Sequence, residues 1–368
     1  MNVSRTKLLT YIGLPTALAL CLVALIGVNI TTNIINAQIN TAMMNQVQQG
    51  SLKVQHFFSR YAQLSKNHYH EPSLLSWFEN HTQRGADLSD NPDYDRVNQQ
   101  LIHLSSNDDN IISAFFASNI TGEYFRENNI TGVGIEVADG EYYANKRPWF
   151  IATLKKGVMN TRSPSADFST GRTSSAIEGP VRNGSGKLIG VAGIDLNLAA
   201  INKVIDNIQY ENQGFAFLLD NKANIVHLPK RGKLNNFKIT TKAIDFDGDS
   251  ISDESGKPVI VTTSIKVNHP IKAFDSQPQT NGFAQFSTHL QAQGDGLSKV
   301  EFMGESYSLT FKAIKLESPQ MNWTIGLMVP TKQVKGPVWR LQFYTLAGVV
   351  ALIGLLLSMI FFVCAPKD

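Results

Sequence analysis

Two long segments without a single charged residue lie near opposite ends of this 368-residue chain, at Leu8 to Ile30 and at Leu341 to Cys364. A helix needs roughly 20 consecutive apolar residues to cross a hydrocarbon core about 30 Å thick, and both segments reach that length. The first segment is longer than the roughly 7–15 apolar residues of a cleaved signal peptide. We therefore predict two transmembrane helices, over residues 8–30 and 341–364.

The charges that flank the first segment predict its orientation. Arg5 and Lys7 precede it, and no Lys or Arg follows before Lys53. Because positive residues stay on the cytoplasmic side, the N-terminus is expected inside the cell. Residues 1–7 and 365–368 are then cytoplasmic stubs, and the roughly 300 residues between the spans lie outside. We expect a two-pass membrane protein with its large region outside, in the periplasm if the cell is Gram-negative, suited to sensing, binding or anchoring.

Composition excludes several classes of function. The 33 Lys+Arg and 30 Asp+Glu leave a net charge of only +3, which gives no strong field for nucleic acid. The two cysteines, Cys21 and Cys364, lie in apolar runs at opposite ends, so they cannot form a disulfide framework or a thiolate metal site. We expect no nucleic-acid partner, no cofactor and no metal.

The first part of the outer region has the pattern of one long helix. Its apolar residues recur every three or four positions between residues 31 and 66, which describes a single helical face. They are Ile35, Ile39, Met43, Val47, Val54, Phe57, Phe58, Tyr61 and Leu64. A helix over 31–66 would rise about 50 Å from the membrane as a stalk. Its apolar face is expected to pack against its own domain or against a second subunit.

The rest of the outer region alternates short β-like runs with turn signals and two short helices. The helices are predicted at 149–156, between Pro148 and Gly157, and at 197–208. The strands are predicted at 111–117, 173–181, 187–196, 214–220, 225–228, 259–267, 282–287, 301–315 and 323–329. Asn183 to Gly186 forms a hairpin turn between two of them. We predict an α+β fold of two consecutive units, each with an antiparallel sheet, joined near Tyr210.

One short segment, residues 142–150, combines side chains that suit a small polar ligand. Arg147 offers a planar fork for a carboxylate, Trp149 an N–H group and an apolar wall, and Tyr142 a hydroxyl. Trp149 as a core residue and Arg147 in a surface ion pair explain the same segment equally well. Asp195, near the end of an apolar strand, needs a partner because an unpaired buried charge is costly. A ligand ammonium, a backbone turn or Arg147 would each supply the partner that Asp195 needs.

Three stretches of the chain resemble the double Cache (dCACHE) sensor family. They are Arg147 to Phe150, Asp167 with Thr170 to Arg172, and Gly190 to Leu196. Two later stretches, 214–220 and 323–330, resemble the opening and closing strands of that family's membrane-proximal module. The resemblance covers nearly the whole outer region, in order.

This resemblance implies two tandem PAS-like (Cache) modules on a long N-terminal helix, flanked by two transmembrane helices. The ligand would bind in the membrane-distal module, 67–210, and the membrane-proximal module would span 211–335. In amino-acid-binding members, an Arg and a Trp hold the ligand carboxylate while Tyr and Asp side chains hold its ammonium. The matching positions are Tyr142, Arg147, Trp149, Asp167 and Asp195. Phe150 and Ser165 stand where those members usually have tyrosines.

The resemblance implies a sensor for an amino acid or amine, anchored in the bacterial inner membrane with its sensor region in the periplasm. It would signal across the bilayer as chemoreceptors do. Such a sensor could act as a homodimer and would signal through a cytoplasmic domain or a partner protein. The chain is then either part of a longer receptor or a stand-alone unit. The alternatives are the input region of a diguanylate cyclase or histidine kinase, or a protein-docking membrane module. No enzyme is expected, because Gly304 to Tyr307 lacks the second glycine of a nucleophile elbow.

Overall fold

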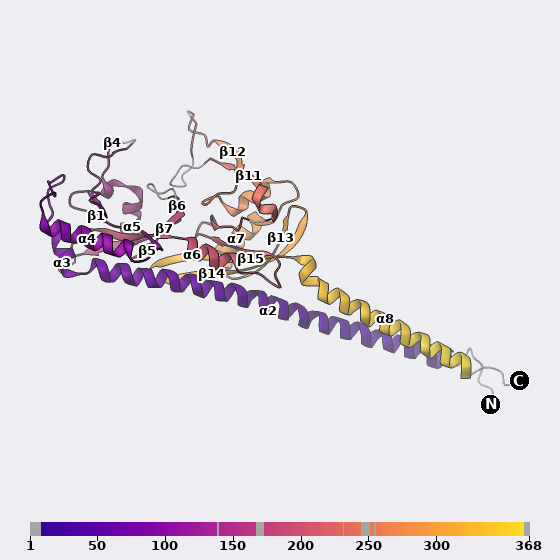
Figure 1. Ribbon diagram of the computed structural model, residues 1–368. Helices are drawn as coiled ribbons and strands as arrows, with labels where there is room; N and C mark the ends of the chain where they lie inside the picture. The colour runs from indigo at the N-terminus through magenta and orange to yellow at the C-terminus, as the bar shows by residue number, and fades with distance from the viewer. Residues whose placement is uncertain are drawn as a thin grey trace.

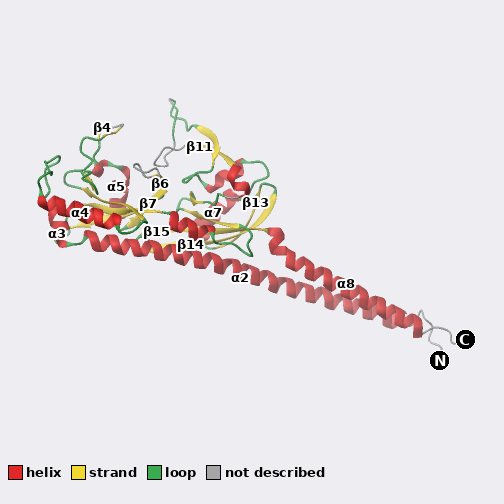
Figure 2. Ribbon diagram, in the orientation of Figure 1, coloured by secondary structure: helices red, strands yellow, loops and turns green. Residues whose placement is uncertain are grey.

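The computed structural model describes residues 9–137, 140–166, 173–230, 232–243, 251–253 and 255–363. The protein has the predicted α+β architecture, with a large sheet lying along one very long helix (Figures 1 and 2). That helix, α2 (Leu14–Tyr69), follows a short π-helical turn, η1 (Leu9–Gly13). The first predicted span and the predicted stalk therefore form one continuous helix.

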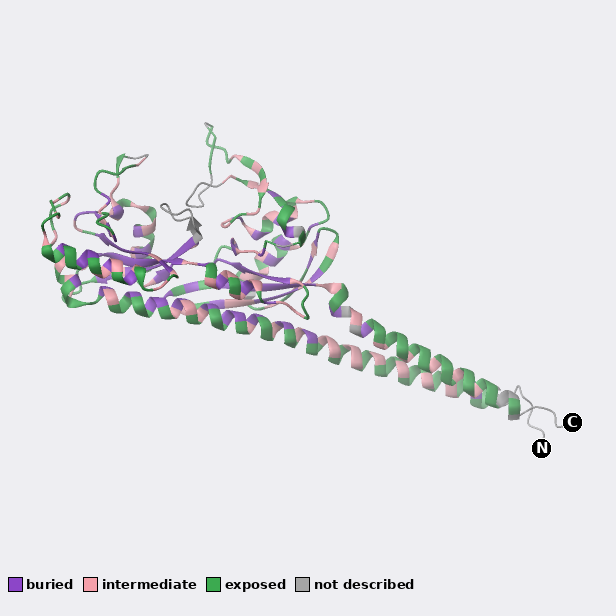
Figure 3. Ribbon diagram, viewed as in Figure 1, coloured by how far each residue is buried: buried purple, intermediate pink, exposed green. Residues whose placement is uncertain are grey.

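The two ends of the chain form an apolar pair of helices that extends away from the sheet. Helix α8 (Thr331–Val363) runs beside the N-terminal part of α2, and both chain ends lie at the same end of the molecule (Figure 1). The segments long and apolar enough to cross a membrane are Thr10–Tyr69 and Val338–Met359. Large apolar residues in both segments, such as Leu22 and Leu355, are exposed. Figure 3 shows both helices mostly in the colours of exposed and intermediate residues where they extend beyond the sheet. The predicted apolar helices at both ends are confirmed.

Within the described residues, the main sheet has eleven strands in two groups. The first strand set consists of β1 (Ile111–Ser118), β2 (Tyr124–Arg126), β5 (Asn160–Thr161), β6 (Ser165–Ala166), β7 (Thr173–Arg182) and β8 (Leu188–Asn197). The second strand set consists of β9 (Phe215–Leu219), β10 (Ile225–His227), β13 (Gly296–Phe302), β14 (Glu305–Glu317) and β15 (Gln320–Pro330). Pairing within each set is antiparallel, as predicted. The first set lies farther from the chain ends (Figure 1).

The two strand sets join through one parallel contact. Asn160 in β5 pairs with Gln320 in β15, and the Gln320 amide donates to the Met159 carbonyl at 2.7 Å. The two predicted antiparallel sheets are thus continuous with each other. Two small hairpins stand apart from the main sheet, β3 (Glu136–Val137) with β4 (Gly140–Glu141) and β11 (Lys238–Lys242) with β12 (Ile260–Ser264).

The remaining helices cover the two faces of the sheet. The apolar core on the α2 side also takes in α3 (Pro72–Asn80), α4 (Pro92–Ser106) and α6 (Ala199–Asp206). The opposite face carries η2 (Ala144–Lys146), α5 (Pro148–Lys156), η3 (Gly232–Asn236), η4 (Ile271–Ser276) and α7 (Phe283–Gln293). The predicted apolar stripe of α2, including Met43, Val47 and Phe58, is buried against the protein's own sheet. This is one of the two arrangements that the sequence left open.

Two strand predictions in the second half are wrong. The predicted strand 282–287 is the start of helix α7, where Phe283 and Phe286 recur at helical spacing and are fully buried. The predicted strand 301–315 is two strands, because a turn at Met303 and Gly304, both with positive φ, reverses the chain between β13 and β14. Helices α3 and α4 were not predicted.

Candidate functional site

The predicted ligand-binding residues gather on the face of the first strand set that points away from α2. Side chains alternate along a strand, so Ile194 of β8 joins the α2-side core while the neighbouring Asp195 faces the other side. Helix α5 covers this second face, where its Phe150 packs against Val191 of β8. The site is therefore built between α5 and strands β1, β7 and β8.

Helix α5 positions three of the predicted residues. Pro148 begins the helix and Gly157 ends it with a φ of 71°, as the sequence predicted. Arg147 is the residue immediately before the first turn, and Trp149 is half-buried within that turn. Phe150 is only 1% exposed and holds the helix on the sheet. The Phe150 ring therefore lies in an apolar contact.

An aromatic wall surrounds Trp149. Its ring centroid lies 5.7 Å from that of Phe115 in β1 and 6.0 Å from that of Tyr124 in β2, both in edge-on arrangements. Tyr124 in turn lies 6.1 Å from Tyr142. A Cβ at Gly193 would lie 2.8 Å from Phe115 Cζ, so the glycine leaves room for the Phe115 ring. The sheet thus supports Trp149 through Phe115.

Arg147 and Tyr142 are neighbours in space. The Arg147 guanidinium lies 5.6 Å from the centre of the Tyr142 ring. The backbone of Tyr142 is fixed on both sides, because its amide donates to the Ile135 carbonyl at 2.8 Å and its carbonyl accepts from Arg84 Nη2 at 2.9 Å. The Arg147 guanidinium and the Tyr142 ring therefore lie together beside Trp149.

Asp195 belongs to a buried network of charged groups. Its Oδ2 accepts from the Ser113 hydroxyl at 2.6 Å, and its Oδ1 accepts from Arg162 Nη2 at 3.2 Å. Arg162 Nη1 lies 3.5 Å from Glu178 Oε2, and Glu178 Oε1 accepts from the Thr153 hydroxyl of α5 at 2.7 Å. Asp195 and Glu178 are 6% and 2% exposed, whereas the Arg162 side chain is 31% exposed. The guanidinium is therefore the accessible member of the network.

The surroundings shift the pKa values of these groups in different directions. Burial alone would lower the pKa of Arg162, but the carboxylates of Glu178 and Asp195 outweigh it and raise that pKa. Burial raises the pKa of Glu178, against the opposing effects of Arg162 and Thr153. Burial and the Asp195 carboxylate raise the pKa of Tyr124. Arg162 is thus a permanent cation, and the Tyr124 hydroxyl keeps its proton as a donor.

Arg162 links the two sides of the site. Its guanidinium carbon lies 5.7 Å from the Trp149 ring centre while its Nη2 contacts Asp195. Among the described residues, the partners of Asp195 are therefore Arg162 and Ser113, and not the Arg147 that the sequence offered as one candidate. The site presents two guanidinium groups, Arg147 and Arg162, along one aromatic wall.

The structure brings most, but not all, of the predicted residues together. Tyr142, Arg147, Trp149 and Asp195 lie on the same face of the first strand set. The backbone of Ser165 lies in the short edge strand β6, which pairs with β7. Asp167 lies outside the described residues.

The sequence reasoning missed Arg162 and Glu178, although one signal for them existed. In the predicted hairpin, the register pairs Ala176 with Asp195 and Glu178 with Gly193, so Glu178 and Asp195 share one face. Two buried carboxylates on one face require a cation. Arg162 itself follows a two-residue strand in an irregular stretch, and nothing local distinguishes it from a surface arginine.

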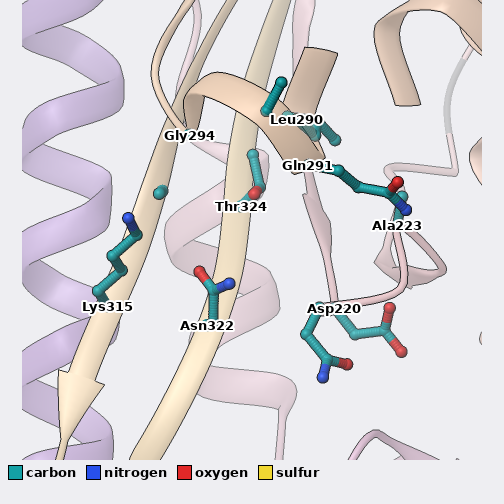
Figure 4. Close-up of a pocket in the computed structure, with 11 residues that line it drawn as sticks. Asp220, Ala223, Leu290, Gln291, Gly294, Lys315, Asn322 and Thr324 are labelled. Atoms are coloured by element: carbon teal, nitrogen blue, oxygen red, sulfur yellow. The ribbon is translucent and has the colours of Figure 1, made fainter. Parts of the chain in front are cut away.

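A separate polar hollow of about 150 Å³ lies in the second strand set (Figure 4). Asp220, Leu290, Gln291, Lys315, Asn322 and Thr324 are among the residues that line it. None of the predicted ligand-binding residues lines it. The described part of the chain contains no group of three His, Cys, Asp or Glu side chains placed to hold a metal ion.

Comparison with known proteins identifies relatives of this architecture. A sequence profile of the Cache domain matches residues 31–338. The methyl-accepting chemotaxis protein PctB of Pseudomonas aeruginosa is 24% identical over 220 residues, covering 60% of this chain and 28% of PctB. McpC of Bacillus subtilis, also a methyl-accepting chemotaxis protein, is 30% identical over 125 residues, covering 33% of this chain and 19% of McpC. The chain thus spans less than a third of the length of either relative.

Solved structures show the same fold at low sequence identity. The ligand-binding domain of PctB in complex with L-arginine is 18% identical, with a TM-score of 0.51 over 81% of this chain and 97% of that domain. The ligand-binding domain of the Pseudomonas fluorescens chemoreceptor CtaA in complex with L-leucine is 17% identical, with a TM-score of 0.53 over 82% of this chain and 99% of that domain.

Proposed function

The chain belongs to the Cache domain family, and from that premise we propose that it is the sensor region of a membrane receptor for a small ligand that carries both a carboxylate and an amino group. An L-amino acid is the simplest such ligand. The similar domains of PctB and CtaA are in complex with L-arginine and L-leucine. The site of this chain offers the matching chemistry, which is binding and not catalysis.

One observation carries the proposal most directly. Trp149 and Asp195, which come from different elements, both contact the Arg162 guanidinium, at 5.7 Å and 3.2 Å. Tyr124 adds a second connection, because its ring packs on Trp149 while the Asp195 carboxylate helps to raise the pKa of its hydroxyl. The side proposed for the ligand carboxylate and the side proposed for its ammonium therefore meet at one side chain, that of Arg162.

Each residue has a distinct role in this proposal. Arg147 and the indole N–H of Trp149 donate to the ligand carboxylate. Asp195 accepts from the ligand ammonium, since a carboxylate with two oxygens accepts more bonds than the two it makes here. Tyr142 contributes its hydroxyl, and Asp167 a second carboxylate. Phe150 and Ser165 leave this site with two fewer phenol hydroxyls than a site with tyrosines there.

The membrane arrangement belongs to the same proposal. The sensor region lies in the periplasm, with modules at 67–210 and 211–335, between the inner-membrane spans 8–30 and 341–364. The receptor acts as a homodimer, and it passes the signal to a cytoplasmic signalling domain or partner protein. The paired apolar helices α2 and α8 support this arrangement.

Thermal unfolding of the full chain in lipid nanodiscs tests the proposal. The probes are the twenty L-amino acids and γ-aminobutyrate, added singly. At least one is expected to raise the melting temperature, because a ligand that binds only the folded state stabilises it by about 2.7 kcal/mol at 100 times its dissociation constant. Arg147→Ala and Asp195→Ala are expected to abolish that increase.

Arg96 and Asp93 provide matched controls. They form an exposed ion pair on α4, away from the site. Arg96→Ala and Asp93→Ala should leave the ligand-induced increase intact. If no probe stabilises the wild type and a periplasmic protein co-purifies with it, the protein is instead a membrane module that docks another protein.

A further inference from the structure

A short stretch of chain, Met159–Pro164, is shared by the two strand sets; we call it the bridging segment. On its first side it pairs with β7, where Thr161 lies opposite Ile177. The Arg162 amide donates to the Ala176 carbonyl at 2.9 Å, and the Ser175 hydroxyl donates to the Arg162 carbonyl at 2.6 Å. The backbone that carries Arg162 is therefore firmly attached to the strands of the candidate site.

On its other side the bridging segment makes three contacts, one to the second strand set and two to loop residues beside it. The Gln320 amide of β15 donates to the Met159 carbonyl at 2.7 Å. The Ser163 hydroxyl donates to Asp220 Oδ2 at 3.0 Å, and Asn268 Nδ2 donates to the Pro164 carbonyl at 2.6 Å. Asp220 is 3% exposed and also accepts from the amides of the turn between β9 and β10, so it is a rigid anchor.

The strand that receives the first of these contacts, β15, leads directly into the second apolar helix. β15 begins at Gln320, pairs with β14 along its whole length, and ends at Pro330. Helix α8 begins at the next residue, Thr331. A displacement of the bridging segment therefore reaches α8 through one hydrogen-bonded strand.

We propose that Arg162 couples the occupancy of the candidate site to the second strand set and, through β15, to α8. This inference rests on the proposed function, because it assigns a consequence to ligand binding at that site. Arg162 acts as a positioning residue: it orients Asp195 on one side and carries the bridging segment on the other.

The physical basis is that the Arg162 guanidinium contacts two carboxylates, those of Asp195 and Glu178. Nη2 contacts Asp195 at 3.2 Å and Nη1 contacts Glu178 at 3.5 Å. A ligand ammonium at Asp195 weakens the first contact, since it places a second positive charge beside the same carboxylate. Arg162 then shifts toward Glu178, which Thr153 holds in place. A ligand biases the protein only if it interacts differently with the two arrangements, and this competition supplies that difference.

Hydrogen–deuterium exchange of the full chain in nanodiscs, with the same amino-acid probes, tests the coupling. In the wild type, a stabilising probe should change amide exchange both at α5 and in β15 with the start of α8. In Arg162→Gln, a saturating probe should still change exchange at α5, whereas the change in β15 should be lost. A β15 change of wild-type size in Arg162→Gln would overturn the inference.

If Arg162→Gln binds no probe, a second variant still tests the coupling. Ser163→Ala with Asn268→Ala removes two contacts between the bridging segment and the loops beside the second strand set, without altering a proposed ligand contact. This double variant should bind the probe with unchanged affinity and show a reduced change in β15. The control is Asn281→Ala, which removes an exposed hydrogen bond to Glu301. An undiminished β15 change in the double variant, or an equal loss in the control, would refute the coupling.

A ligand-free comparison separates failure of this inference from failure of the proposed function. If no probe stabilises the wild type, the proposed function fails. The coupling then still requires that Arg162→Gln accelerate exchange of the Gln320 amide in the unliganded protein. Equal exchange in wild type and variant would overturn the coupling alone.

Discussion

The indole ring of Trp323 in β15 packs edge-on against the ring of Phe58 in α2, with centroids 5.0 Å apart and planes inclined by 76°. Both side chains are buried in the core between the long helix and the sheet. This contact joins the helix that begins at the N-terminal apolar segment to the strand that leads into the C-terminal one. The long helix and the strand that leads into α8 are therefore packed against each other in the core of the folded region.

Trp323→Ala is expected to destabilise the protein by about 3–5 kcal/mol, because it removes a large buried ring and leaves a cavity. Thermal unfolding in nanodiscs measures the effect. Leu297→Ala, at an exposed position in β13, is the control and should change stability by less than about 0.5 kcal/mol. Equal effects of the two variants would contradict the packing described here.

Glu123→Gln is expected to cost about 1.5–3 kcal/mol near pH 7, the contribution of a hydrogen bond to a charged group. The Glu123 carboxylate accepts from His81 Nε2 at 2.6 Å and from the Gly85 amide at 3.1 Å. Burial would raise the pKa of Glu123, but these hydrogen bonds outweigh it and lower the pKa. The stabilisation is therefore complete above the unfolded-state pKa and is lost as the pH falls through the lowered value.

Unfolding of wild type and Glu123→Gln across pH 3 to 8 checks this direction. The difference between them should shrink in acid. Glu136→Gln, exposed in β3, serves as the control. If the stability difference between the two proteins grew as the pH fell, the lowered pKa of Glu123 would be contradicted.

Glu178→Gln should show the opposite pH dependence. Burial raises the pKa of Glu178, so the folded state holds this proton more tightly than the unfolded chain does. The contribution of Glu178 to stability is then greatest at low pH and declines as the pH rises from the unfolded value of about 4.5 through the raised folded value. The stability of wild type relative to Glu178→Gln should fall over that range, as measured by unfolding at each pH. A relative stability that rises instead would show that Arg162 dominates over burial.

Gly193→Ala is expected to disturb the candidate site through Phe115. The added Cβ would collide with the Phe115 ring and with the Ile177 carbonyl, and overpacking of this kind costs about 1–3 kcal/mol. Because Phe115 supports Trp149, the ligand-induced increase in melting temperature should also fall. Gly184→Ala in the hairpin turn, where a Cβ has open space, is the matched control. An unchanged ligand response in Gly193→Ala would remove Phe115 from the support of the site.

Cysteine labelling in cells tests the proposed orientation. In a chain with Cys21→Ala and Cys364→Ala, Ser185→Cys introduces a thiol at an exposed hairpin turn. A membrane-impermeant maleimide should label it from the periplasmic side. Lys7→Cys, on the predicted cytoplasmic stub, should react only after lysis. Protection of Ser185→Cys in intact spheroplasts would reject the orientation.

The fold was predictable where the sequence pattern is long or has clear boundaries. The helix through residues 31–66 repeats its apolar positions over many turns, and the hairpin of β7 and β8 has a well-defined turn at Asn183 to Gly186. The sequence predicts a strand at the start of helix α7 because Phe283, Ala284 and Phe286 alone do not distinguish helical from strand periodicity. The joining of the two sheets depends on a single residue pair, Asn160 with Gln320, which no local pattern encodes.

The candidate site was predictable only in part, for a related reason. Arg147 and Trp149 lie together in sequence at the start of a helix with clear end signals, and Asp195 stands out in an apolar strand. Arg162 is recognisable only in three dimensions, because its importance comes from Glu178 and Asp195 on neighbouring strands. Asp167 remains a prediction from the resemblance.

Because α2 is one continuous helix, a change of tilt at one of its ends displaces the other end. Its 56 residues give a rod about 84 Å long, at 1.5 Å per residue. If such a rod tilts by about one degree at its apolar end, its far end moves by about 1.5 Å, which matches the ~1–2 Å helix shifts typical of switching proteins. At that far end the Tyr69 hydroxyl donates to the Gly193 carbonyl, inside the sheet that carries the candidate site. A tilt at the apolar end would therefore be passed along one continuous helix to the strand that also carries Asp195.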